Sequence, residues 1–223
     1  MKPGVAWVLI GCLFAAPALP TRAQPSDIPN TATSAPAEGQ SLEGQALLNA
    51  LRAGGYVIYL RHTATDFSRR DDAMTGYDDC ANQRLLSPQG RSDATAIGRR
   101  IVELKLPVGE VLASPMCRTM EHARLSFGRA TPTPEIREGR SDDYPGLKRL
   151  LATPVRAGTN RWIVGHGTPF RAVAGPPHLA EGEAAVIKPL GDGWMVVARV
   201  EVADWVALGA AAPKAASSAA SRP

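Results

Sequence analysis

The sequence predicts an α/β fold, because short apolar strands alternate with amphipathic helices along the chain. Three short runs rich in β-branched, aromatic and other apolar residues are each followed by polar residues or glycine, at positions 56–60, 111–113 and 161–164. With 223 residues the chain can bury one substantial core. We therefore expect a single α/β domain with a tail at each end.

The first expected elements are a helix, a turn and a buried strand. Residues 42–52 are amphipathic, Gly54-Gly55 ends that helix, and residues 56–60 (YVIYL) form a compact apolar strand. A polar loop at 63–86, about 24 residues long, follows the strand and exceeds what a structural connection requires. A long loop beside a strand end favours a functional site there.

The next two helices have similar start signals. Ser87 is expected to cap a helix with Pro88 at its first position, and apolar residues recur at helical spacing up to residue 104. After the strand at 111–113, Ser114-Pro115 repeats the pattern before a helix that runs to about residue 127. The remaining predicted elements are a helix at 143–152 and strands at 161–164, 184–190 and 194–202.

The composition is that of an ordinary globular protein. Hydrophobic residues make up 44% and charged residues 21%, which argues against a disordered chain and against a multispanning membrane protein. The formal charge is +4, but the basic residues are scattered and no basic stripe is interleaved with aromatic residues. We therefore expect no nucleic-acid partner.

The N-terminal residues 1–23 have the features of a secretory signal peptide: a basic start, an apolar core and a small-residue cleavage region. Prolines interrupt the apolar run, so we expect no membrane span. Residues 24–40 are expected to form a flexible leader, 41–208 the domain and 209–223 a disordered tail. The protein is then periplasmic or secreted; the alternative is a lipoprotein, anchored by lipid on Cys12.

Two cysteines remain after the expected cleavage, Cys80 and Cys117. An even pair in an exported protein favours a disulfide, and the alternative is two buried thiols. Neither has a second Cys or His at the spacing of a zinc site, so we expect no metal.

Basic side chains follow three of the predicted strands. Arg61 and His62 come directly after residues 56–60, Arg118 follows the strand at 111–113, and His166 lies between two glycines after the strand at 161–164. Ligands of open α/β sheets bind at the carboxyl ends of the strands. A single histidine at a strand end is more often structural, but three such ends together predict an anion site.

These motifs resemble those of the histidine phosphatase superfamily, also called phosphoglycerate mutase-like, with Arg-His, Ser-Pro-x-x-Arg and Gly-His-Gly in the same order. The resemblance covers roughly residues 42–206 and includes the stretch CANQRLLS at 80–87. It implies a three-layer sandwich with a mostly parallel central sheet and helices on both faces. It also implies a phosphate pocket formed by Arg61, His62, Arg118 and His166.

Phosphoryl transfer suits these residue types. Two guanidiniums can hold the equatorial oxygens of a phosphoryl group while the neutral imidazole of His62 attacks in line. Arg61 and Arg118 would also disfavour a protonated His62, and His166 would donate a hydrogen bond to the same oxygens. We expect a phosphomonoester hydrolase that works through a phosphohistidine, with no metal or cofactor.

The proton donor to the leaving oxygen is left open. The family places an acidic residue after the second motif, where Glu138 matches best; its rivals are Asp66, Glu121 and Glu183, and each could instead be solvated surface charge. Thr65 could add a hydroxyl donor to the phosphate, although loop threonines are usually turn formers.

Three further residues bear on the resemblance. His122 stands where relatives commonly show threonine, so it either faces the pocket or is an ordinary helix side chain. His178 lies in a proline-rich loop and is expected at the surface, and Thr168 stands where one branch has an acid beside its second histidine.

The expected substrate is a phosphorylated small molecule or an envelope sugar phosphate, for example in the lipopolysaccharide core. Two alternatives are retained: a catalytically inactive phosphate- or phosphosugar-binding protein, and a phosphoglycerate-type mutase. Export argues against the mutase, since that reaction belongs to the cytoplasm.

Overall fold

The computed structural model describes residues 41–139 and 143–210. The predicted signal peptide, Cys12 and the predicted leader lie outside these residues, as do positions 211–223 of the predicted tail. Among the described helices, none combines the length and apolar character that crossing a membrane requires.

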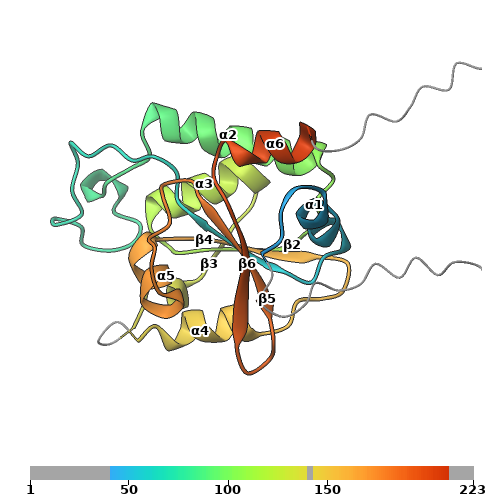
Figure 1. Cartoon of the computed structure of the whole chain (residues 1–223). Coiled ribbons are helices and arrows are strands. Elements are labelled where there is room, and N and C mark those ends of the chain that lie inside the picture. The colour runs from blue at the N-terminus through green and yellow to red at the C-terminus, as the bar shows by residue number, and fades with distance from the viewer. Residues whose placement is uncertain (1–40, 140–142, 211–223) are drawn as a thin grey trace, which may run out of the picture. The chain divides into compact units, whose positions relative to one another are not determined.

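A six-stranded sheet lies between the helices (Figure 1). Its strand order is β3-β2-β4-β1-β5-β6. Strands β1 to β4 all run parallel to one another, whereas β5 runs antiparallel to both β1 and β6. The strands are β1 (Val57–Arg61), β2 (Val108–Ala113), β3 (Thr131–Pro132), β4 (Asn160–Gly165), β5 (Ala184–Pro189) and β6 (Trp194–Val200).

Helices cover both faces of this sheet, as Figure 1 shows. One face packs against α1 (Gly44–Ala53), α2 (Pro88–Glu103), α3 (Cys117–Phe127) and α6 (Asp204–Ala210). The other packs against α4 (Pro145–Ala152) and α5 (Gly167–Ala174). Successive strand residues point to opposite faces of the sheet. Ile58 and Leu60 therefore enter the core beneath α1, α2, α3 and α6, and Val57 and Tyr59 enter the core beneath α4 and α5. The predicted three-layer sandwich with a mostly parallel sheet is confirmed.

Several elements differ from the sequence-based expectation. The sequence did not indicate β3, α5 or α6, and α6 reaches two residues into the segment expected to be a tail. Ser87 caps α2 as expected, accepting a hydrogen bond from the backbone N–H of Gly90 at 3.0 Å. Ser114 was wrongly expected to cap the next helix: α3 begins at Cys117 after Met116, because the Ser114 hydroxyl instead contacts His166.

The long loop at 63–86 is held in place by polar contacts and a disulfide. The buried side chain of Gln83 donates to the carbonyl of Tyr77 at 2.9 Å and accepts from the backbone N–H of Cys117 at 2.9 Å. A disulfide joins Cys80 to Cys117, the pair expected from the sequence, with their Cα atoms 5.7 Å apart. The loop is thereby attached to the first turn of α3, which carries the neighbouring Arg118.

Candidate active site

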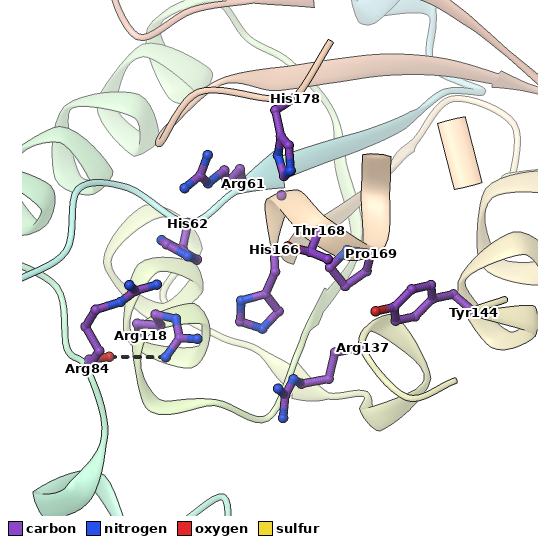
Figure 2. Close-up of a pocket in the computed structure, with 11 residues that line it drawn as sticks. Arg61, His62, Arg84, Arg118, Arg137, Tyr144, His166, Thr168, Pro169 and His178 are labelled. Atoms are coloured by element: carbon purple, nitrogen blue, oxygen red, sulfur yellow. Dashed lines mark hydrogen bonds between the residues drawn. The ribbon is translucent and has the colours of Figure 1, made fainter. Parts of the chain in front are cut away.

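The three motif-bearing strands end at one edge of the sheet. Arg61 is the last residue of β1 and His62 follows it, Arg118 lies on α3 after β2, and His166 follows β4. All four line one cavity of about 320 Å³ (Figure 2). Parallel neighbouring strands produce this convergence, since β4 pairs with both β1 and β2. The structure thus brings together the four residues that the motifs predict.

His62 is almost fully buried, with 2% of its surface exposed. Its Nδ1 atom lies 3.0 Å from the carbonyl oxygen of Thr63. Since a carbonyl only accepts hydrogen bonds, we assign the imidazole proton to Nδ1, which leaves a lone pair on Nε2. Burial lowers the pKa of His62 to about 3, and the positive charges of Arg118 and Arg61 act in the same direction. The ring is therefore neutral near pH 7, with a nucleophilic Nε2.

A second histidine, His122, contacts the backbone next to His62. The backbone N–H of Thr63 donates to Nδ1 of His122 at 3.2 Å, so His122 holds the backbone of the residue whose carbonyl contacts His62. His122 is fully buried on α3, and burial lowers its pKa to about 3. It does not line the cavity; its sequence position revealed neither its burial nor this contact.

The backbone around His166 is fixed by one tyrosine. The Tyr59 hydroxyl donates to the carbonyl of His166 at 2.9 Å and accepts from its N–H at 2.9 Å. A Cβ atom at Gly165 would lie 2.1 Å from this hydroxyl, so only glycine fits there. Nε2 of His166 lies 2.8 Å from the Ser114 hydroxyl; when that hydroxyl donates, Nδ1 carries the proton and can donate to a phosphate oxygen.

Each of the two predicted arginines contacts an acidic residue and a backbone carbonyl. Arg61 donates to the carbonyl of Leu179 at 2.6 Å and lies 3.7 Å from Glu181. Arg118 donates to Asp71 at 3.1 Å and to the carbonyl of Arg84 at 3.2 Å. The Nε–H group of each is buried without a hydrogen-bond partner among the described residues. A bound anion would satisfy such donors.

The structure does not bring Glu138 or Thr65 into the lining of the cavity. Glu138 accepts a hydrogen bond from the Tyr77 hydroxyl at 2.9 Å. The Thr65 hydroxyl donates to Glu181 at 2.8 Å, and Glu181 also lies 3.9 Å from Nδ1 of His62. Thr65 therefore contacts a carboxylate that faces the nucleophile.

The three rival acids lie in other contacts. Asp66 accepts from Ser68, Glu121 pairs with Arg91 at 2.6 Å, and Glu183 pairs with Arg199 at 2.5 Å. Among the described residues, no carboxylate lines the cavity. Over residues 41–139 and 143–210, no group of three or more His, Cys, Asp and Glu side chains is arranged to hold a metal ion.

Sequence reasoning missed several residues of the site. Arg84 and Arg137 line the cavity, Asp71 pairs with Arg118, and Glu181 pairs with Arg61. Arg84 lies in the stretch that carries the family resemblance and could have been singled out there. The others lie in irregular segments, where no periodicity or motif marked them. His178 is exposed, as expected, and lies at the cavity.

No family model matches the chain, and no curated protein matches it. Similar solved structures include the protein histidine phosphatase SixA complexed with tungstate, 15% identical over 67% of this chain and 98% of that one, with a TM-score of 0.48. A mycobacterial glucosyl-3-phosphoglycerate phosphatase with VO3 is 16% identical over 64% and 97% (TM-score 0.44). Phosphoglycerate mutase from Bacillus anthracis is 13% identical over 72% and 99% (TM-score 0.48).

Proposed function

We propose that the protein is a phosphomonoester hydrolase that transfers the phosphoryl group to His62 and then to water. The observation that carries this proposal is the neutral, Nδ1-protonated His62 in a cavity that it shares with Arg61, Arg118 and His166. The lone pair on Nε2 is the nucleophile, and the three other side chains supply donors for the phosphoryl oxygens.

The reaction has two steps. In the first, an Nε2–P bond forms on His62 while the bond from phosphorus to the leaving oxygen breaks; in the second, water attacks phosphorus and the N–P bond breaks. Arg61 and Arg118 stabilise the charge on the equatorial oxygens in both transition states. Because these guanidiniums supply the positive charge, the proposed chemistry is independent of a metal ion.

The leaving oxygen must acquire a proton, or depart as a stable anion. Glu138, the acid suggested by the family resemblance, contacts Tyr77 rather than the cavity. We therefore expect the enzyme to be fastest on substrates whose leaving group is a weak base, which departs with little protonation. The substrate would be a phosphorylated small molecule, and an envelope sugar phosphate is included in the proposal.

The proposed location is the periplasm or cell envelope. The signal-like pattern of residues 1–23 supports it, as does the Cys80–Cys117 disulfide, since disulfides persist in oxidising compartments. Cell fractionation, together with the mass of the mature chain, tests this location. Recovery in the cytoplasm with residues 1–23 intact would contradict it, and a lipid on Cys12 would reveal the anchored form.

The activity is tested with p-nitrophenyl phosphate in the presence of a chelator. The wild type should release phosphate, and His62→Ala should lower the turnover at least about 10³-fold, because the nucleophile is gone. Arg149→Ala is the matched control, since Arg149 pairs with Glu135 outside the cavity and should be dispensable. Full activity in folded His62→Ala, or loss of activity with chelator alone, would contradict the proposal.

A second candidate is a phosphate- or phosphosugar-binding protein without turnover. The observation in its favour is that no described carboxylate lines the cavity to act as a general acid. Phosphate binding measured by calorimetry, combined with no hydrolysis of any phosphomonoester tried, would favour this candidate over the enzyme.

A further inference from the structure

Two of the cavity's arginines have a different electrostatic environment from the two that the motifs predict. Arg61 and Arg118 lie within 3.7 Å and 3.1 Å of a carboxylate. Within the described part of the chain, the guanidinium groups of Arg84 and Arg137 form no ion pair with a carboxylate within 4.0 Å, although both line the same cavity; the backbone N–H of Arg84 donates to Asp71 at 2.8 Å. The cavity therefore holds two positive charges beyond those of the predicted phosphate site.

Aromatic rings of the long loop hold these two guanidiniums. The guanidinium carbon of Arg84 lies 4.8 Å from the centre of the Phe67 ring, and that of Arg137 lies 5.8 Å from the centre of the Tyr77 ring. Such contacts orient a guanidinium while leaving its N–H groups available to other acceptors. The Nε–H of Arg84 is buried and has no hydrogen-bond partner within residues 41–139 and 143–210.

The two arginines approach the phosphate site from different sides. Arg84 lies beside Arg118, whose guanidinium donates to the carbonyl of Arg84 at 3.2 Å. In the view of Figure 2, Arg84 and Arg118 lie to the left of the His166 ring and Arg137 lies below it. The charges of Arg137 and Arg84 both contribute to lowering the pKa of His166, after burial and the nearer His62 and Arg118. Both charges thus act on the place where the phosphoryl group would bind.

The cavity has room for more than a phosphoryl group. Its volume of about 320 Å³ is at the lower end of the range for small-molecule sites. A single phosphate carries at most two negative charges near neutral pH. Four arginines around one small cavity, two of them without an acidic partner, suit a ligand with more negative charge than that.

We infer that Arg84 and Arg137 form a second anion subsite, so that the preferred ligand is a small molecule with a second anionic group besides the phosphate that is transferred. This inference rests on the proposed function and narrows its substrate class to polyanions such as bisphosphorylated or carboxylated phosphate esters. The long loop at 63–86 builds the subsite, since it contributes Arg84 itself and the Tyr77 ring that holds Arg137.

Binding of two non-hydrolysable probes tests the subsite without turnover. Methylphosphonate offers one anionic group and methylenediphosphonate offers two. We expect calorimetry on the full mature chain to show that methylenediphosphonate binds at least about tenfold more tightly than methylphosphonate. The reason is that the guanidiniums of Arg84 and Arg137 can bind the second phosphonate group. Arg137→Gln and Arg84→Gln should each reduce that ratio to about two or three.

Two matched controls separate a built subsite from general surface charge. Arg149→Gln removes an equal charge from a pair outside the cavity and should leave the ratio at its wild-type value. Tyr77→Phe keeps the ring under Arg137 and should retain the preference, whereas Tyr77→Ala should lower it.

The outcomes distinguish this inference from the proposed function. If the folded protein hydrolyses p-nitrophenyl phosphate and binds methylphosphonate but shows no preference for methylenediphosphonate, the second subsite is wrong and the hydrolase stands. A preference that survives both arginine substitutions would also overturn the subsite. If neither probe binds and no ester is hydrolysed, both proposals fall.

Discussion

The two sides of the cavity differ in how their cations are held. On the side of the strand ends, Arg61 ends β1 and pairs with Glu181, and Arg118 lies in the first turn of α3 and pairs with Asp71. On the side of the long loop, the guanidiniums of Arg84 and Arg137 contact aromatic rings and form no ion pair within 4.0 Å among the described residues. In the first arrangement each guanidinium lies beside a carboxylate, whereas in the second each guanidinium lies against an aromatic ring.

This difference suggests a division of roles. Side chains fixed by strand ends and ion pairs can hold a transition state to within the small tolerances that phosphoryl transfer requires. The positions of side chains on a loop depend on the contacts of that loop. A change in the loop sequence can therefore alter substrate preference while the sheet stays the same. We therefore assign chemistry to the strand-end side and ligand preference to the loop side.

The largest effect should come from the strand-end side. Arg118→Ala should lower kcat/KM for p-nitrophenyl phosphate about 10²–10³-fold, because a bidentate donor to the transition-state charge is lost. Arg118→Lys should recover only part of this, since an ammonium keeps the charge but not the fork of donors. Steady-state kinetics measure both, and equal activity of the Lys variant and the wild type would show that charge alone matters.

Removing the disulfide should affect the loop side most. The bridge closes a segment with a sequence separation of 37 residues, so a Cys80→Ser, Cys117→Ser double variant should lose about 3 to 4 kcal/mol of unfolding free energy in urea. Its preference for methylenediphosphonate should fall further than its turnover of p-nitrophenyl phosphate. An unchanged stability, or a loss confined to turnover, would contradict the division between the two sides.

Acid should destabilise the protein through its buried histidines. The pKa of His62 and of His122 is about 3 in the folded state, mainly because of burial, against about 6.5 when unfolded. Between these values the unfolded chain binds more protons, so stability falls as pH is lowered through that window. Between pH 7 and pH 5 the free energy of unfolding should fall by on the order of 2 kcal/mol for each of these histidines.

Urea unfolding at several pH values checks this acid sensitivity. His122→Asn removes one buried imidazole while keeping an acceptor for the Thr63 N–H, so its stability should depend less steeply on pH than that of the wild type. The carboxylates whose pKa is lowered in the folded protein affect stability only at lower pH; they are Asp66, Asp71, Asp79 and Glu183. A slope unchanged by His122→Asn would show that this ring is not buried in its neutral form.

The smallest effect should come from Glu138. Because this carboxylate contacts Tyr77 outside the cavity, Glu138→Gln should change kcat for p-nitrophenyl phosphate by less than about threefold. Aryl phosphates with leaving groups of increasing basicity provide the sharper measurement. A loss of tenfold or more that grows with leaving-group basicity would identify Glu138 as the general acid after all.

The sequence predicts most of the sheet and the four strand-end residues, for a shared physical reason. Apolar runs bounded by turns identify parallel strands, and the carboxyl ends of such strands must meet, which places Arg61, His62, Arg118 and His166 together. The family resemblance then suggests their roles, which the proposed experiments test.

The remainder depends on contacts that no local pattern encodes. Glu181 reaches Arg61 across more than a hundred positions of sequence, and Tyr77 reaches Arg137 from a loop without periodicity. Ser114 and His122 had sequence features of a helix cap and an ordinary helix residue, yet their side chains face His166 and the Thr63 peptide. Tertiary contacts overrode the local signal at both positions.

The most direct test of His62 as the nucleophile is to trap the phosphorylated intermediate on this residue. Phosphohistidine is stable in base and labile in acid, so a rapid quench in base during turnover, followed by peptide mass spectrometry and phosphorus NMR, should locate the phosphoryl group. Since Nδ1 donates to the carbonyl of Thr63, we predict phosphate on Nε2 of His62 and none in His62→Ala. Phosphate on another residue, on Nδ1, or on no residue while turnover proceeds would contradict the account.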